Sequence, residues 1–164
     1  MADSGTIFTI ANILENLTPI GYALASFINR RIESGKKEKA ETAQLMYNVY
    51  GEVKKNLDNA SEFKQGVFRT IAVNSPKCKE IAAGFSTTAM TDLYKKHSSI
   101  KNKKKKEAII DALDKSIQRI NKFRTLTEMS DKIVKIKPKT NIELRLRNIK
   151  QQQLALYNAL FKKR

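Results

Sequence analysis

Apolar residues recur at intervals of three and four positions along most of this 164-residue chain. Two of the stripes formed in this way are Leu45, Val49, Val53, Leu57 and Ile109, Ile110, Leu113, Ile117, Ile120. Such spacing places apolar side chains on one face of an α-helix. The chain also has only 6 glycines and 3 prolines, too few for a turn-rich β architecture. The sequence therefore predicts an all-α fold, a helical bundle of about five to six helices.

Residues typical of helix ends lie between the apolar stripes and predict where individual helices begin and end. Ser75 is a suitable N-cap and is followed by Pro76 at the first helical position. The helix that starts there is expected to continue to the region of His97. Thr140 and Glu143 have the spacing of a capping box ahead of the last helix.

The N-terminal segment is unusually apolar. Residues 7–28 contain one charged residue, Glu15, and are followed by Arg30 and Arg31, a length and flank also found in membrane-spanning helices. Polar residues and a proline interrupt the segment at Thr9, Asn12, Asn16, Thr18, Pro19 and Ser26. These interruptions favour a pair of helices, broken at the proline and buried against protein. A membrane span and a helix lying in the membrane interface are the open alternatives.

The chain is expected to have two parts. Residues 1–34 form an apolar N-terminal helical arm, and residues 35–164 form a basic helical bundle. The single cysteine, Cys78, cannot form an internal disulfide and shares the register of Ile81, so we expect it to be buried. Asp3 stands where a secretory signal would carry basic residues, so no signal peptide is expected.

Net charge is the strongest feature of the composition. There are 32 Lys and Arg residues against 16 Asp and Glu, a formal charge of +16 with a pI near 10.0. A small protein with this surplus repels itself unless a polyanion neutralises it. Residues 98–164 hold most of the surplus, with 19 basic and 6 acidic residues. The expected partner is therefore nucleic acid or, less favoured, an anionic membrane surface.

Lysines occupy the expected first turns of three helices. They are Lys36, Lys37 and Lys39 in the first, Lys77 and Lys79 in the second, and Lys103, Lys104, Lys105 and Lys106 in the third. A helix N-terminus carries about half a positive charge, so each cation there is unfavourable by roughly 0.3–1 kcal/mol. The same position is a ready site for phosphate. We interpret these lysines as phosphate contacts; the alternative is that a lysine-rich composition scatters them everywhere.

Further basic residues complete the candidate interface. Lys115, Arg119 and Lys122 lie opposite the apolar stripe of their helix and form a cationic ridge. The segment KIVKIKPKTN lacks a helical pattern, and its proline favours extended geometry. Side chains two apart in an extended strand point the same way, about 6.6 Å apart. Phosphates along one strand could therefore be followed by Lys135, Lys137 and Lys139; a solvated linker is the alternative. Arg30 and Arg31 join this set.

We find no arrangement typical of an enzyme. His97 is the only histidine, and the sequence has no Cys/His pair with ligand spacing, no glycine-rich phosphate loop and no paired carboxylates at active-site intervals. His97 itself is expected to lie exposed near a helix end. We therefore expect no catalytic activity, no metal and no cofactor.

The aromatic residues distinguish between kinds of nucleic acid. Most fall on or beside the apolar stripes: Tyr47, Tyr50, Phe63, Phe68, Phe85, Tyr94, Phe123 and Tyr157. That placement leaves no platform on which unpaired bases would stack. No helix-turn-helix or zinc-finger pattern appears. Sequence-independent contact with the phosphates of a duplex is therefore expected; the choice between DNA and RNA stays open at this point.

The segment ANILENLTPIGYALASFI, followed by basic helices, resembles the DNA-wrapping capsid proteins of archaeal rod-shaped and filamentous viruses. The resemblance covers the N-terminal segment and the overall composition, and it carries over no individual residue. It implies an α-helical coat subunit that assembles with itself or a related second subunit into a helical filament around double-stranded DNA.

Three functions follow as hypotheses. The first is a structural virion protein that polymerises on duplex DNA. The second is a non-polymerising helical subunit of an intracellular nucleoprotein, such as the small subunit of an RNA-guided defence complex. The third is a membrane-perturbing bundle in which residues 7–28 insert and the basic surface meets anionic lipid.

Overall fold

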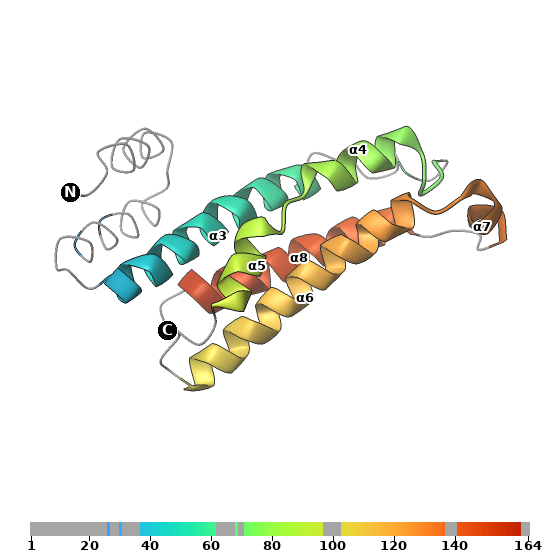
Figure 1. Ribbon diagram of the computed structural model, residues 1–164. Coiled ribbons are helices and arrows are strands. Elements are labelled where there is room, and N and C mark those ends of the chain that lie inside the picture. The colour runs from blue at the N-terminus through green and yellow to red at the C-terminus, as the bar shows by residue number, and fades with distance from the viewer. Residues whose placement is uncertain are drawn as a thin grey trace.

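The computed structural model describes residues 26, 30, 37–61, 68, 71–96, 103–136 and 141–161. Within these residues every regular element is a helix, which confirms the all-α prediction (Figure 1). The helices are α3 (Lys37–Ser61), α4 (Pro76–Gly84), α5 (Thr88–Lys95), α6 (Lys103–Thr127), α7 (Asp131–Ile136) and α8 (Ile142–Phe161).

Four rods of helix form an antiparallel bundle (Figure 1). Three rods are the single helices α3, α6 and α8, and the fourth is the pair α4 and α5. The α4–α5 rod packs on α3 and α6, and α8 packs on the same two helices from the other side. Successive rods run in opposite directions, which is the up-down-up-down arrangement of a four-helix bundle. The short helix α7 lies at one end, between α6 and α8.

The core fills the centre of this bundle. Fully buried side chains come from every rod and include Val49, Val53, Ile81, Met90, Leu93, Ile109, Leu113, Ile120, Phe123, Ile149 and Leu156. The rings of Phe85 and Phe123 meet edge to face with centroids 6.2 Å apart. Cys78 is also fully buried, as predicted. Truncating a buried Leu or Ile to Ala typically costs about 2–5 kcal/mol, so the periodic stripes are what hold the rods together.

The predicted single helix from Pro76 to the region of His97 is wrong. The chain leaves helical geometry after Gly84 and resumes it at Thr88. Phe85, between the two helices, has extended backbone with φ −76° and ψ 148°. A break of this kind exposes N–H and C=O groups that no longer have partners within a helix. Side chains from α3 and α6 supply those partners.

Glu52 of α3 caps the start of α5. Its carboxylate, 8% exposed, accepts hydrogen bonds from the backbone N–H groups of Ala89 at 3.0 Å and Met90 at 2.8 Å. It also accepts one from the Ser86 hydroxyl at 2.5 Å. One turn along α3, Asn56 donates to the Ser86 carbonyl and accepts from the Ser86 N–H, each at 2.8 Å. A carboxylate at this position also interacts favourably with the helix dipole.

Asn59 and Arg124 cap the end of α4. Asn59 Nδ2 donates to the Ile81 carbonyl at 3.0 Å, and Arg124 Nη2 donates to the Phe85 carbonyl at 2.6 Å. A cation beside a helix C-terminus is again the favourable sign. Gly84 lies close to α3, because a Cβ there would stand 2.8 Å from Asn59 Nδ2. The close approach therefore requires glycine at this position.

Two other helix starts test the predicted caps. Ser75 caps α4 as predicted, since its hydroxyl accepts a hydrogen bond from the Cys78 N–H at 3.3 Å. The predicted Thr140 cap of the last helix is wrong by one residue. Asn141 Oδ1 accepts from the Leu144 N–H at 2.9 Å, and α8 begins directly after Asn141. Asparagine is a stronger N-cap than threonine, which accounts for the shift.

The segment KIVKIKPKTN was expected to be non-helical, and its first part is helical. The Ser130 carbonyl accepts hydrogen bonds from the N–H groups of Ile133 and Val134, both at 3.0 Å, at the start of α7. Asp131 places a carboxylate in the first turn and accepts a hydrogen bond from Asn74 at 2.6 Å. Val134 packs against the core. Tertiary contacts thus support a helix that is too short to be stable alone.

The predicted arm at 1–34 lies outside the described residues, apart from Ser26 and Arg30, which are exposed. The boundary between 34 and 35, and the choice between burial against protein and burial in lipid, stay predictions. Within the described part of the chain, no helix combines the length and apolar character needed to cross a membrane.

Candidate nucleic-acid interface

The predicted lysine clusters lie at the two opposite ends of the bundle. Because α3 and α6 run in the same direction, their first turns lie at one end (Figure 1). The end of α5 lies there too, since Lys96 Nζ is 3.3 Å from Glu41 Oε2 near the start of α3. We call this surface the lysine end and define it by Lys95, Lys96 and residues 103–106. The start of α4 lies at the opposite end.

The helix α6 begins within the lysine run, as the sequence predicts. Its first residue is Lys103, so all four lysines occupy the first turn, which contains no acidic residue. Lys103, Lys104 and Lys105 are exposed, and Lys106 is partly buried. The first N–H groups of a helix lack intrahelical partners and add to the positive potential. The run therefore disfavours its own helix and creates a strong local attraction for anions.

The lysines at the start of α4 have carboxylate partners. Lys77 Nζ lies 3.1 Å from Glu80 Oε2, and Lys79 Nζ lies 3.6 Å from Glu128 Oε2. All four side chains are well exposed, so each pair contributes at most about 1 kcal/mol. These two lysines already have carboxylate partners in the free protein. Their charges are therefore less available for contact with phosphate.

The cationic ridge lies on the exposed face of α6, as the apolar stripe implied. Lys115, Arg119 and Lys122 are all exposed, whereas Ile120 and Phe123 beside them are buried. Lys115 Nζ pairs with Asp111 Oδ2 at 2.7 Å. The ridge therefore offers Arg119 and Lys122 more readily than Lys115.

The structure says less about the remaining candidates. Arg30 is exposed. Lys37 and Lys39 lie in the first turn of α3, and Lys135 lies in α7; their side chains are not described. The prediction that three lysines alternate along one extended strand is therefore wrong for Lys135, which lies in a helix. Outside the described residues are Arg31, Lys36, Lys137, Lys139 and also His97.

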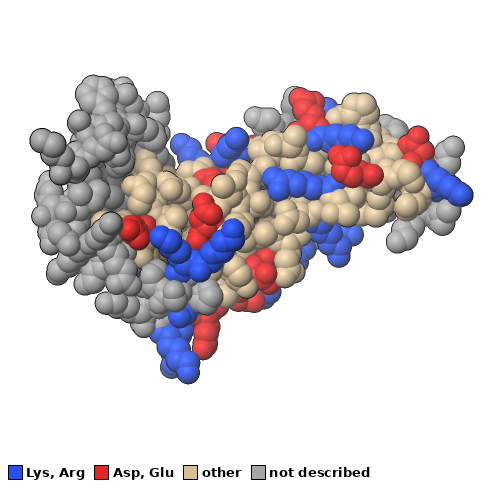
Figure 2. Space-filling view, viewed as in Figure 1, with Lys and Arg blue, Asp and Glu red and all other residues tan. Residues whose placement is uncertain are grey.

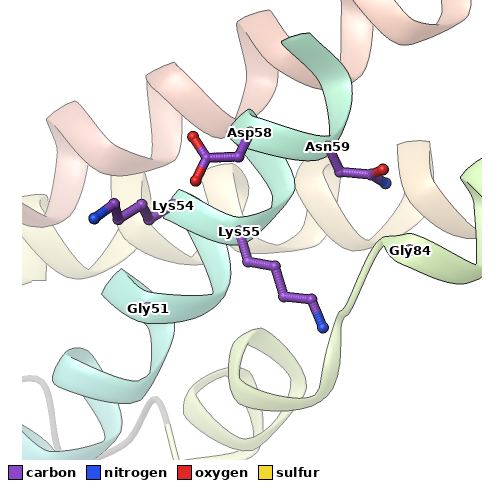
Figure 3. Close-up of a pocket in the computed structure, with 6 residues that line it drawn as sticks. All are labelled: Gly51, Lys54, Lys55, Asp58, Asn59 and Gly84. Carbon is purple, nitrogen blue, oxygen red and sulfur yellow. The ribbon is translucent and has the colours of Figure 1, made fainter. Parts of the chain in front are cut away.

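A hollow between α3 and the end of α4 was not predicted. It has a volume of about 390 Å³ and is lined by Gly51, Lys54, Lys55, Asp58, Asn59 and Gly84 (Figure 3). Two of these residues are exposed lysines that the sequence analysis did not select. A signal was present, since Gly51 precedes Lys54 and Lys55 by three and four positions and so shares their side of the helix. The contribution of Gly84 could not be anticipated without the fold.

Basic residues also extend along the sides of the bundle. Figure 2 shows Lys and Arg side chains along the described part of the visible face, interspersed with Asp and Glu. On α8, Arg147 and Lys150 are exposed. The surface thus combines a broad distribution of cations with one concentrated cluster at the lysine end.

None of the described aromatic side chains is exposed. Tyr47, Tyr50, Phe68, Phe85 and Phe123 are buried, and Tyr94, Tyr157 and Phe161 are partly buried. Tyr50 and Phe161 pack edge to face with ring centroids 5.5 Å apart, so these rings are engaged in packing. Burial raises the pKa of Tyr47 and of Tyr157. The predicted placement of the aromatic residues on or beside the apolar stripes is confirmed for those that the structure describes.

The described residues contain no cluster of His, Cys, Asp and Glu that could hold a metal ion. Burial raises the pKa of the Cys78 thiol, which keeps it protonated and a poor nucleophile. Glu52, the most buried carboxylate, is occupied by the three donors at the start of α5.

Comparisons of the chain with protein-family models, with curated proteins and with solved structures return no match. The function must therefore be inferred from the charge, the exposed side chains and the arrangement of the helices.

Proposed function

We propose that this protein is a structural subunit that coats duplex nucleic acid, with DNA favoured, by neutralising backbone phosphates without reading base sequence. The observation that carries the proposal is the first turn of α6, where four lysines stand at the positive end of a helix with no acidic residue. Lys95 lies at the same end of the bundle, as does Lys96, whose ammonium group is already paired with Glu41. A phosphate bound there would offset a cost that the free protein otherwise bears.

The amount of charge agrees with coating. Duplex DNA carries one negative charge per about 1.7 Å of its axis, so a net charge of +16 neutralises about 27 Å of duplex. The longest helices have 25 residues and span about 37 Å. One subunit therefore carries enough charge for a length of duplex comparable to its own size.

The kind of contact follows from the exposed side chains. Among the described residues, exposed Lys and Arg outnumber exposed Asp and Glu, and the aromatic rings are packed inside or partly covered. Ammonium and guanidinium groups bind phosphates regardless of sequence, whereas unpaired bases are held by stacking on exposed rings. These features support binding to the backbone of a duplex.

The finer proposal is a viral coat subunit, in line with the resemblance to the capsid proteins of archaeal rod-shaped and filamentous viruses. Assembly needs contacts between subunits, and the apolar segment 7–28 together with the exposed Ile133, Leu144 and Leu154 could provide them. Electron microscopy of the purified protein with and without linear duplex tests this point. Filaments that require duplex support a coat subunit, and discrete particles of fixed size favour the subunit of a nucleoprotein complex.

Charge-matched variants test the site of binding. We expect substitution of Lys103, Lys104 and Lys105 by glutamine to weaken duplex binding and to reduce the slope of log affinity against log salt by up to about 2.7, since each lost phosphate contact changes it by about 0.9. The control replaces Lys132, Arg147 and Lys150, all exposed, by glutamine and removes the same charge. Equal effects of the two triple variants would contradict a role for the lysine end, because they would reflect net charge alone.

A further inference from the structure

Lys55 extends into the hollow between α3 and the connection from α4 to α5 (Figure 3). We infer that this hollow receives one backbone phosphate of the bound duplex, with Lys55 as its cationic contact. The inference rests on the proposed function and adds a second, separate point of contact on the side of the bundle.

The space for a phosphate comes from Gly51. Gly51 lies one turn before Lys55 on α3, and the Lys55 side chain extends from that helix towards the connection between α4 and α5 (Figure 3). A Cβ built on Gly51 meets no atom within 4 Å, which shows open space over this turn. The position over Gly84, across the hollow, is occupied by the Asn59 side chain, because a Cβ there would stand 2.8 Å from Asn59 Nδ2. At Gly51, in contrast, a backbone phosphate can approach α3 more closely than it could at a residue with a side chain.

The charge of Lys55 is available to a ligand. Among the described residues neither Lys54 nor Lys55 has an ion pair or a hydrogen bond, in contrast to Lys77, Lys79 and Lys115. Asp58 lines the same hollow, but Figure 3 shows it extending with Lys54 on one side of α3, while Lys55 and Asn59 extend on the other.

Glu52 is the other carboxylate on this part of α3, and it does not compete for Lys55. It is 8% exposed, and its oxygens accept hydrogen bonds from Ser86, Ala89 and Met90. The N-terminus of α5 is therefore already capped by a protein carboxylate. Lys55 is therefore the lysine of the hollow that extends away from Asp58, and its charge is available to an external anion.

The chemistry of the hollow suits a phosphate that is part of a polymer. A volume of about 390 Å³ lies near the lower limit of small-molecule sites. A single ammonium group directed into it gives a free phosphate little affinity. A polymer is held at other points as well, and the lysine end lies about 12 Å from the connection along α5, whose eight residues rise about 1.5 Å each. A duplex that contacts both places binds more tightly than at either place alone, because the two contacts are linked through one polymer.

Single substitutions in the full-length chain test the inference. We measure the affinity of each variant for a random-sequence duplex as a function of salt. Lys55→Gln is expected to weaken binding and to reduce the salt slope by about 0.9, the value for one phosphate contact. Gly51→Gln is expected to weaken binding severalfold without a change in charge, because its side chain fills the hollow. The controls lie at exposed positions of α8: Lys150→Gln removes the same charge as Lys55→Gln, and Ala155→Gln introduces the same side chain as Gly51→Gln.

The outcomes separate the inference from the proposed function. Larger losses for the two hollow variants than for their controls support the inference. If the wild-type protein binds duplex and each hollow variant matches its control, the hollow is not a phosphate site, and the proposed function stands. If the wild-type protein does not bind duplex, both fail. If the hollow variants instead lose binding to an oligoglutamate peptide and keep their affinity for duplex, the hollow serves an acidic peptide and the inference is overturned.

Discussion

Replacing Glu52 by alanine is expected to destabilise the protein by about 3–5 kcal/mol, because this side chain holds α5 in place. The substitution leaves the N–H groups of Ala89 and Met90 without their acceptor. Each unsatisfied buried donor costs about 1–3 kcal/mol. Loss of a carboxylate at a helix N-terminus adds about 0.3–1 kcal/mol. The Ser86 hydroxyl can rotate towards another acceptor, so we add nothing for it.

Urea unfolding followed by circular dichroism measures this effect as a change in the free energy of unfolding. Glu52→Gln is expected to fall between wild type and Glu52→Ala, because the amide keeps one oxygen as an acceptor but loses the charge. Glu41→Ala is the surface control; it removes the ion pair with Lys96, and its effect should be below about 1 kcal/mol. A Glu52→Ala protein within about 1 kcal/mol of wild type, with an unchanged m-value, would refute the assigned role of Glu52.

Two further predictions concern side-chain space and thiol chemistry. Gly84→Ala should lower the free energy of unfolding by about 1–3 kcal/mol, because its Cβ would stand 2.8 Å from Asn59 Nδ2. Gly51→Ala should raise it by about 0.5–1 kcal/mol, because the added Cβ meets no atom and alanine favours the helix; the same sign for both would contradict the packing described. Burial raises the pKa of Cys78, so its thiolate is scarcer at pH 8 than that of an exposed cysteine. Reaction of the native protein with a disulfide reagent should therefore be much slower than after unfolding, and equal rates would count against burial.

The periodic stripes were sufficient to predict the rods, because burial along a helix depends on spacing within one segment. Ile109, Leu113 and Ile120 are fully buried, as their register implied. The start of α4 could also be predicted from the sequence, since Ser75 and Pro76 are signals local to that helix.

The break between α4 and α5 could not be predicted from the sequence, because the residues that cap the two helix ends at the break are remote in sequence. Glu52 precedes Ser86 by 34 positions, and Arg124 follows Phe85 by 39. The apolar positions of the two short helices continue one helical pattern, so periodicity alone favoured an unbroken helix. The same holds for the hollow, whose shape depends on the approach of Gly84 to Asn59. In contrast, the lysine run at the start of α6 was located correctly, since its position follows from local sequence.

The most direct test of the central claim is the salt dependence of wild-type binding to a random-sequence duplex. The account predicts binding at about 50 mM salt that weakens linearly on a log–log scale with a slope of about −3.6 or steeper, which corresponds to four or more phosphate contacts. Failure to bind at that salt concentration, or a slope shallower than about −1, would contradict the claim that the surplus cations of this bundle serve to neutralise a polyanion.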